Sequence, residues 1–314
     1  MPNQPTIQMS RTLLTGPRAD RVTNFDPDPI VEWQSVTLGV QVTNPRAEPL
    51  DAIVVSPWDP SKSVPVHVDP QSSAAVTLET TAPAGGAGLY FPLELRAPDL
   101  TMMSWGTEGV DVWELYSVAI NQIHCQYPTT KREFGGDTDH LTLAACQIRQ
   151  PGASTQTKTH SEPRVADQDT RQITDMRIGP FAVYPSATWD GLRFSYAMFN
   201  AGHQAAAQAA QDFDNEISNL TASALTALFP AGGFWDKVNT ATQWLNRFFT
   251  GNCDGPILAD IVNYTTVDLE KVTAQGPHSE TRSYHHDFGD FSFACQNADY
   301  TVGWTVWRAG PTGS

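Results

Sequence analysis

The stretch VEWQSVTLGVQVTN, residues 31–44, decides the class of fold. Apolar residues occupy every second position of its later part, namely Val36, Leu38, Val40 and Val42. Successive side chains of a strand point to opposite faces of a sheet, so this alternation predicts a long strand with one buried face. The chain around it is therefore expected to be mainly β.

The N-terminal third of the chain repeats this pattern. Shorter β-patterned runs follow at residues 50–56, 64–68, 74–80 and 90–96, and Asn-Pro or Asp-Pro turn signals precede the first three. Short strands at such intervals are typical of a sandwich. Residues 20–100 resemble the general strand-and-turn pattern of immunoglobulin-like modules. The resemblance implies an immunoglobulin-like β-sandwich over residues 1–105, and it implies a fold only, because such modules serve many functions.

Residues 106–314 are expected to form a larger β-sandwich domain. Its β-patterned runs lie at 114–125, 141–148, 178–184, 192–199 and 300–307. The first two are predicted to pair as a hairpin around the polar tip GGDTDH at 135–140, and the polar stretch 151–170 is expected to be an exposed loop. In the last run the pattern places Tyr300, Val302, Trp304 and Val306 on one face and Thr301, Gly303, Thr305 and Trp307 on the other.

One helix-forming segment, residues 203–250, interrupts the β pattern. Its first apolar stripe consists of Phe213, Ile217, Leu220, Ala224 and Leu228, and its second consists of Trp235, Val238, Thr242, Leu245 and Phe249. The sequence PAGG at 230–233 separates the two. This spacing predicts a helical hairpin. Residues 203–230 contain acidic residues and no Lys or Arg, which favours packing on the sheet over binding at a membrane surface.

The formal net charge of −15 limits the classes of partner. A nucleic-acid binder needs clustered Lys and Arg to neutralise phosphates, and docking on anionic lipid needs them too, so both are disfavoured. No apolar run has the length of a transmembrane helix. An acidic surface suits calcium-containing surroundings or a basic partner, and it also serves solubility alone.

The N-terminus and the cysteines bear on the compartment. No signal peptide is visible in the opening MPNQP, and an extracellular or surface-associated location is nevertheless favoured. The four cysteines form two local pairs, Cys125 with Cys146 and Cys253 with Cys295. Local disulfides and four buried free thiols both remain open.

Metal-binding candidates are aspartates in turn-forming segments. Asp137 and Asp139 lie in GGDTDH, and Asp254 lies in NCDGP. Calcium takes several hard oxygen ligands from flexible loops, so these three residues are the candidate calcium ligands, with a polar hairpin tip and a helix-ending turn as the alternatives. The histidine-rich stretch 278–290 is expected to be a solvated loop. Zinc is disfavoured there because the adjacent His285 and His286 would point to opposite faces of a strand.

No catalytic motif is present, so no residue is assigned a catalytic role and no cofactor is required. The leading hypothesis is a non-enzymatic binding or assembly module, with or without calcium and with homo-oligomers as an option, that recognises a carbohydrate or protein surface. Some of the nine tryptophans, including Trp105, would then stack on sugars. The alternatives are a secreted hydrolase with loop-borne carboxylates and a toxin-like protein that releases its helical hairpin.

Overall fold

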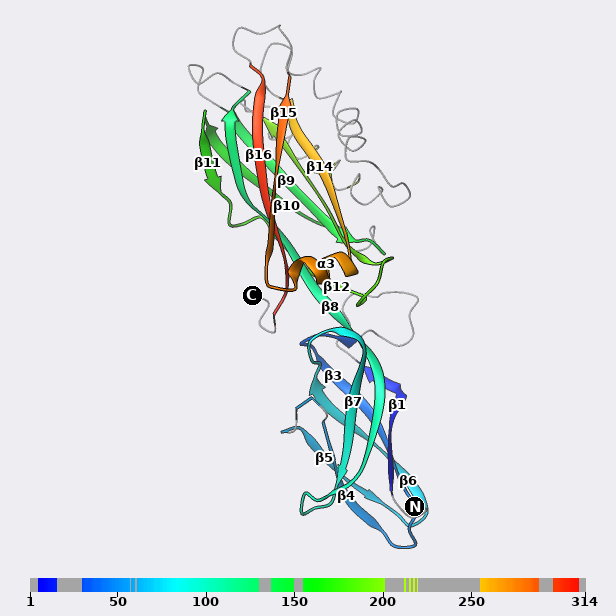
Figure 1. The fold of residues 1–314 in the computed structure, drawn as a ribbon. Helices are drawn as coiled ribbons and strands as arrows, with labels where there is room; N and C mark the ends of the chain where they lie inside the picture. Colours follow the sequence, from blue (N-terminus) through cyan, green and yellow to red (C-terminus); the bar gives the residue numbers. More distant parts are fainter. Residues whose placement is uncertain are drawn as a thin grey trace. The chain divides into compact units, whose positions relative to one another are not determined.

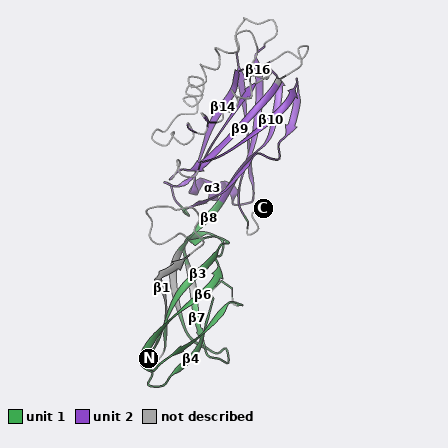
Figure 2. Cartoon of the chain, turned by 180° about the vertical axis from the view of Figure 1, so that it is seen from behind, with its two compact units in different colours: residues 1–115, 184–186, 310–314 green, residues 116–183, 187–309 purple. Residues whose placement is uncertain are grey.

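The computed structural model describes residues 5–15, 30–56, 58–59, 61–129, 137–149, 155–200, 255–287 and 296–310, together with residues 212, 215, 217 and 219. These residues are mainly in β-strands, as the sequence predicts (Figure 1). The chain divides into two compact units (Figure 2). Unit 1 consists of residues 1–115, 184–186 and 310–314, and unit 2 consists of residues 116–183 and 187–309. The division lies between Leu115 and Tyr116, whereas the sequence pattern places a domain boundary at 105/106.

Unit 1 consists of two sheets that share one core. The first has the order β1-β3-β6, and the second has the order β5-β4-β7-β8. Their bounds are β1 Thr6–Thr15, β3 Ser35–Asn44, β4 Leu50–Val55, β5 Ser63–Val68, β6 Ser72–Thr81, β7 Gly86–Arg96 and β8 Met102–Tyr127. The core takes side chains from both sheets, among them Leu38 and Val40 of β3, Val54 of β4 and Leu95 of β7. The four alternating residues of β3 are all buried, which confirms the predicted pattern.

The predicted single strand 31–44 is in fact two strands. β2, Ile30–Val31, pairs with β8, and β3 pairs in the other sheet. A turn at residues 32–34 makes the change of sheet, and Trp33 adopts φ 64° in it. The fully buried Glu32 stabilises the turn, because its carboxylate accepts hydrogen bonds from the backbone N–H groups of Gly85 and Leu115, both at 2.7 Å.

Unit 2 also consists of two sheets around one core. The first sheet has the strand order β10-β9-β13-β14. In the second sheet β16 pairs with β15 on one side and with β8 on the other, and β11 and β12 also pair with β8. Their bounds are β9 Asp137–Gln147, β10 Gln156–Val165, β11 Asp169–Gln172, β12 Arg177–Val183, β13 Gly191–Asn200, β14 Gly255–Thr265, β15 His278–His286 and β16 Ala298–Arg308. Tyr300, Val302, Trp304 and Val306 of β16 are buried in this core, which confirms their predicted common face.

Three local predictions for this region are wrong. The runs 114–125 and 141–148 do not form a hairpin, because they belong to β8 and β9 in different sheets. The stretch 151–170 contains strand β10 instead of being one loop, and 278–286 is strand β15. Both strands lie at the edges of their sheets and carry polar residues on both faces, so no apolar alternation marks them.

The predicted helical hairpin at 203–250 lies outside the described residues, apart from four helical positions. These are Asp212, Asn215, Ile217 and Asn219, of which Ile217 is buried. A short helix that the sequence analysis missed is α3, Thr266–Thr273, which begins at a capping box formed by Thr265 and Asp268. Within the described part of the chain, no helix is long and apolar enough to cross a membrane.

The two described cysteines are not joined. Cys125 of β8 and Cys146 of β9 are buried free thiols, so for this pair the structure decides between the two open alternatives in favour of free thiols. Their strands belong to the two different sheets of unit 2, and proximity in sequence did not bring them together. Cys253 and Cys295 lie outside the described residues, and their pairing stays a prediction.

Candidate functional site

The outer face of β15-β16-β8-β11, here called the polar face, carries an ordered set of polar side chains. Alternation along each strand selects them, because the intervening residues face the core or the other sheet. They are Ser279, Thr281, Ser283 and His285 of β15, Asp299, Thr301, Thr305 and Trp307 of β16, Gln122, His124 and Tyr127 of β8, and Thr170 and Gln172 of β11.

Strand register arranges these side chains in rows that cross the sheet. One row runs Ser283, Thr301, His124 and Thr170, each on a different strand. The Ser283 and Thr301 hydroxyls are 2.8 Å apart, and His124 Nδ1 lies 2.9 Å from Thr170 Oγ1. Hydrogen bonds between neighbours in a row hold the hydroxyl and imidazole groups in fixed positions on rigid strands.

In the next row a glycine replaces one of the polar side chains. It runs Thr281, Gly303, Gln122 and Gln172, and Gln172 donates from Nε2 to Gln122 Oε1 at 3.3 Å. A Cβ at Gly303 would lie 3.1 Å from Asn121 Oδ1, closer than ordinary contact. Glycine therefore leaves room for the Asn121 amide, which donates to Thr305 Oγ1 at 2.6 Å.

Aromatic rings lie at the two ends of the polar face. Tyr127 is 43% exposed and lies opposite Asp299 at one end of β16. Trp307 is half-buried at the other end, and the Arg177 guanidinium lies 4.7 Å from the centre of its ring. The rings add flat apolar surface to a face that otherwise offers hydrogen-bonding groups.

The polar face is close to neutral although the chain is strongly acidic. Among the residues that define this face the one carboxylate is Asp299, which lies 2.7 Å from Nδ1 of His285, and the neighbouring Arg177 guanidinium lies against Trp307. Hydroxyl and amide groups both donate and accept hydrogen bonds. A face built from such groups suits a ligand that is rich in hydroxyls and carries no charge.

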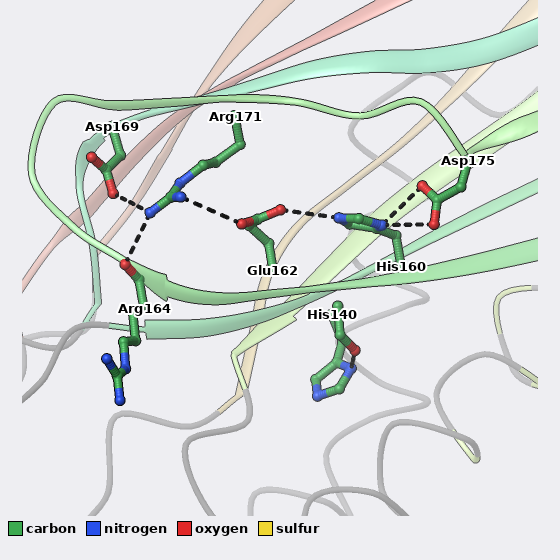
Figure 3. Close-up of polar contacts among 8 residues, drawn as sticks. His140, His160, Glu162, Arg164, Asp169, Arg171 and Asp175 are labelled. Carbon is green, nitrogen blue, oxygen red and sulfur yellow. Dashed lines mark hydrogen bonds and ion pairs between the residues drawn. The ribbon is translucent and has the colours of Figure 1, made fainter.

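An ion-pair cluster of Asp169, Arg171, Glu162, His160 and Asp175 fixes β11 (Figure 3). Thr170 and Gln172 of this strand belong to the polar face, while Asp169 and Arg171 point into the cluster. The Arg171 guanidinium donates to Asp169 Oδ2 at 2.8 Å and to the backbone carbonyl of Arg164 at 3.3 Å. It also lies 3.7 Å from a carboxylate oxygen of Glu162 on β10. These contacts attach a four-residue strand to the edge of the opposite sheet.

His160 is the second cation of the ion-pair cluster. Its Nδ1 lies 3.0 Å from Asp175 Oδ2, and its Nε2 lies 3.1 Å from Glu162 Oε2 (Figure 3). A ring nitrogen that faces an ionised carboxylate acts as a hydrogen-bond donor, so the two contacts together favour the doubly protonated ring. Burial alone would lower the pKa of His160, but the hydrogen bonds and charges of Asp175 and Glu162 outweigh it and raise the pKa above its usual value.

A second polar network holds β15 against β14. Buried Asp260 accepts hydrogen bonds from Arg282 Nη1 at 2.5 Å and from the Tyr284 hydroxyl at 2.8 Å. The Tyr284 hydroxyl also contacts that of Tyr196, and burial raises the pKa of both phenols. The Arg282 guanidinium lies 5.2 Å from the centre of the Trp304 ring. The inner residues of β15 are therefore fixed, and its outer residues keep their places in the polar face.

The predicted calcium site stays a prediction, because the structure describes the side chain of one of its three ligands, Asp139. Asp139 is buried, and its Oδ2 accepts a hydrogen bond from the Tyr300 hydroxyl at 2.9 Å. Asp137 is the first residue of β9, so it belongs to a strand where a turn was expected. Asp254 lies outside the described residues. Where side chains are described, no group of three or more His, Cys, Asp or Glu is arranged to hold a metal.

The sequence analysis missed the polar face as a site. The alternation in β16 placed Thr301, Thr305 and Trp307 on a common face. The residues of β15, β8 and β11 join that face because of how these strands pair, and a local sequence pattern does not reveal strand pairing. The signal that could have found β15 is its alternation of Ser and Thr with larger polar residues in HSETRSYHH, residues 278–286. Neither a protein-family model nor any curated protein sequence matches this chain.

Proposed function

We propose that this protein is a non-enzymatic binding module that recognises a neutral carbohydrate through the polar face. The observation that carries the proposal is the row of hydroxyl and imidazole groups across four strands, on a near-neutral surface with an aromatic ring at each end. Sugar hydroxyls donate and accept hydrogen bonds, as these side chains do. The apolar C–H faces of a sugar ring stack on aromatic rings such as Tyr127 and Trp307.

The dimensions favour a chain of sugars over a single one. Eight residue steps separate Asp299 from Trp307 on β16, and a strand rises about 3.3 Å per residue, so the rings lie roughly 26 Å apart along the strand. An oligosaccharide could contact both ends and the rows between them. The ligand would lie on the surface of the sheet, where its polar groups exchange water for protein hydrogen bonds.

Finer features of the fold belong to the same proposal. The seven-strand order of unit 1, with β1-β3-β6 opposite β5-β4-β7-β8, supports an immunoglobulin-like sandwich. All ten residues of β13 are buried, so both faces of this strand are covered. That burial supports a helical segment at 203–250 packed on the outer face of the first sheet of unit 2.

The test is a screen of neutral oligosaccharides, followed by calorimetric titration of the best ligand. The double variant Ser283→Ala with Thr301→Ala removes two hydroxyls of one row and should weaken binding by about thirtyfold, since each lost hydrogen bond is worth about 1 kcal/mol. Tyr127→Ala should weaken it by a similar factor. The matched control is Thr43→Ala with Ser73→Ala, which removes a cross-strand hydroxyl pair on unit 1, 2.8 Å apart.

Each result of this experiment decides a part of the proposal. Equal binding by the double variant and its control would place the ligand elsewhere, and release of shorter sugars during the titration would make the protein an enzyme. Calcium assistance through Asp137, Asp139 and Asp254 is tested by repeating the titration with calcium and with a chelator. Identical affinities in the two conditions would exclude it.

A further inference from the structure

Unit 1 has an exposed apolar patch at the turn between β7 and β8. Leu100 is 61% exposed, Met102 55% and Trp105 63%. These three residues make up half of the six large hydrophobic residues that are exposed in the described part of the chain. Scattered apolar residues are ordinary on a protein surface, but three within six residues at one end of a hairpin make a candidate interaction site.

A β-bulge places two of these residues on the same face of the sheet. Leu95 pairs with Ser104, whereas the next residue, Arg96, pairs with Met102, so Met103 is the extra residue. Residues three apart in a regular strand point to opposite faces, and one extra residue between them restores a common face. Met102 and Trp105 therefore share the outer face, while Met103 packs against the core.

In the turn, Leu100 occupies a position whose backbone conformation favours a different residue type. Leu100 adopts φ 68°, and its N–H donates to the carbonyl of Ala97 at 2.8 Å. Glycine or asparagine adopts this left-handed conformation at lower cost, and leucine gains no burial in return. A partner that covers the Leu100 side chain would provide the burial that the isolated chain lacks.

Charged groups around these residues define the chemistry of that partner. Arg96 donates from Nε to Glu94 at 2.8 Å, and the two lie directly opposite Met102 and Trp105. Trp, Met and Arg are the residues enriched at the centres of protein interfaces. Two exposed carboxylates lie near the group. Asp99 is in the turn itself. Asp51 of β4 lies two residues before Ile53, the partner of Arg96, and it is 73% exposed although it contacts Nδ1 of His67 at 2.7 Å.

We infer that Leu100, Met102, Trp105, Glu94 and Arg96, here called the Trp105 patch, bind a protein segment that presents apolar side chains between basic ones. The apolar side chains would cover Trp105 and Met102, and the basic ones would face Asp51 and Asp99. The bordering carboxylates and the net charge of −15 favour this partner over a second copy of the chain, which would bring like charges together. The inference is independent of the proposed carbohydrate function, since it concerns a different unit.

The probe is a short fluorescein-labelled peptide of alternating lysine and leucine, titrated with the full chain by fluorescence anisotropy. Two companion peptides separate the contributions: alternating lysine and serine keeps the charge alone, and alternating glutamate and leucine reverses it. We expect binding of the lysine–leucine peptide only. Trp105→Ala should weaken it by about tenfold, the size of effect typical of a central aromatic residue.

The matched control is Trp189→Ala, which removes an indole that is 53% exposed on unit 2. It should leave the affinity unchanged, as should Thr43→Ala. Equal binding of the lysine–serine peptide, or equal loss in both tryptophan variants, would overturn the inference. Two other results would overturn the inference by assigning the patch to another occupant. One is a dimer in sedimentation equilibrium that Trp105→Ala dissociates. The other is binding to phosphatidylcholine vesicles that the same substitution abolishes.

Discussion

At the scale of single residues, the ion-pair cluster makes the stability of unit 2 depend on pH. His160 lies between Asp175 and Glu162, and its pKa is raised above the usual value. A group whose pKa is raised on folding contributes stability below its unfolded pKa, near 6.5, and loses that contribution as pH rises through the folded pKa. The histidine therefore stabilises the fold under mildly acidic conditions and ceases to do so in alkaline ones.

His160→Gln tests this pH dependence. The loss of unfolding free energy relative to the natural sequence should be larger at about pH 5.5 than at about pH 8, because the contribution exists only while the ring is charged. Urea unfolding at the two pH values gives the comparison. His67, whose pKa is also raised by Asp51, is present in both proteins and cancels in the difference. A pH-independent loss would show that the imidazole is held neutral.

Arg171 is predicted to position β11 for ligand binding. Its side chain is 36% exposed, so Arg171→Gln should cost only about 1 kcal/mol of stability. The affinity for the oligosaccharide should nevertheless fall, and the β11 amides should exchange hydrogen faster, because Thr170 and Gln172 lose their anchor. Hydrogen exchange by NMR separates the two effects. Lys62→Gln, an exposed change on unit 1, is the control, and unaltered exchange in β11 would contradict this role.

At the scale of elements, the predictable strands are those with one apolar face. β3 and the inner face of β16 follow from simple alternation, since burial on one side selects every second residue. β10 and β15 escape prediction because their inner residues are ionic: His160 and Glu162 on one strand, Arg282 on the other. A strand whose inner residues are charged and paired with another strand has a polar sequence, and such a sequence alone looks like that of a loop.

The polar face was unpredictable for a further reason. Ser283, Thr301, His124 and Thr170 are far apart in sequence and become neighbours only through strand register. Helix α3 is different, because the sequence TTVD at 265–268 contains its capping signal. A helix of eight residues has little periodicity to add to such a signal, which explains why it was missed.

The helical segment at 203–250 gives a prediction at this scale. Ile217 is helical and fully buried, so Ile217→Ala should cost about 2–5 kcal/mol. Asn215→Ala is the paired control, since Asn215 is helical and exposed and its loss should change little. Denaturant unfolding measures both. A loss below about 1 kcal/mol for Ile217 would mean that the segment does not pack on the body of unit 2.

At the scale of the whole molecule, the two separate cores predict two unfolding events. Leu38 lies in the core of unit 1 and is fully buried. Leu38→Ala should cost about 2–5 kcal/mol and lower the melting temperature of one calorimetric transition by several degrees. Leu143→Ala, in the core of unit 2, should lower the other. If both variants shift a single common transition, the units unfold together.

The two described cysteines of unit 2, Cys125 and Cys146, have a consequence for chemical labelling. Alkylating and disulfide reagents react with the thiolate, and burial raises the pKa of Cys146 to about 11, so little thiolate exists at neutral pH. Cys125 is equally enclosed. Both sulfurs should become reactive only in molecules whose second unit has opened. The rate of alkylation by a small reagent, followed by mass spectrometry, would therefore report how often this unit opens under native conditions, without any engineered probe.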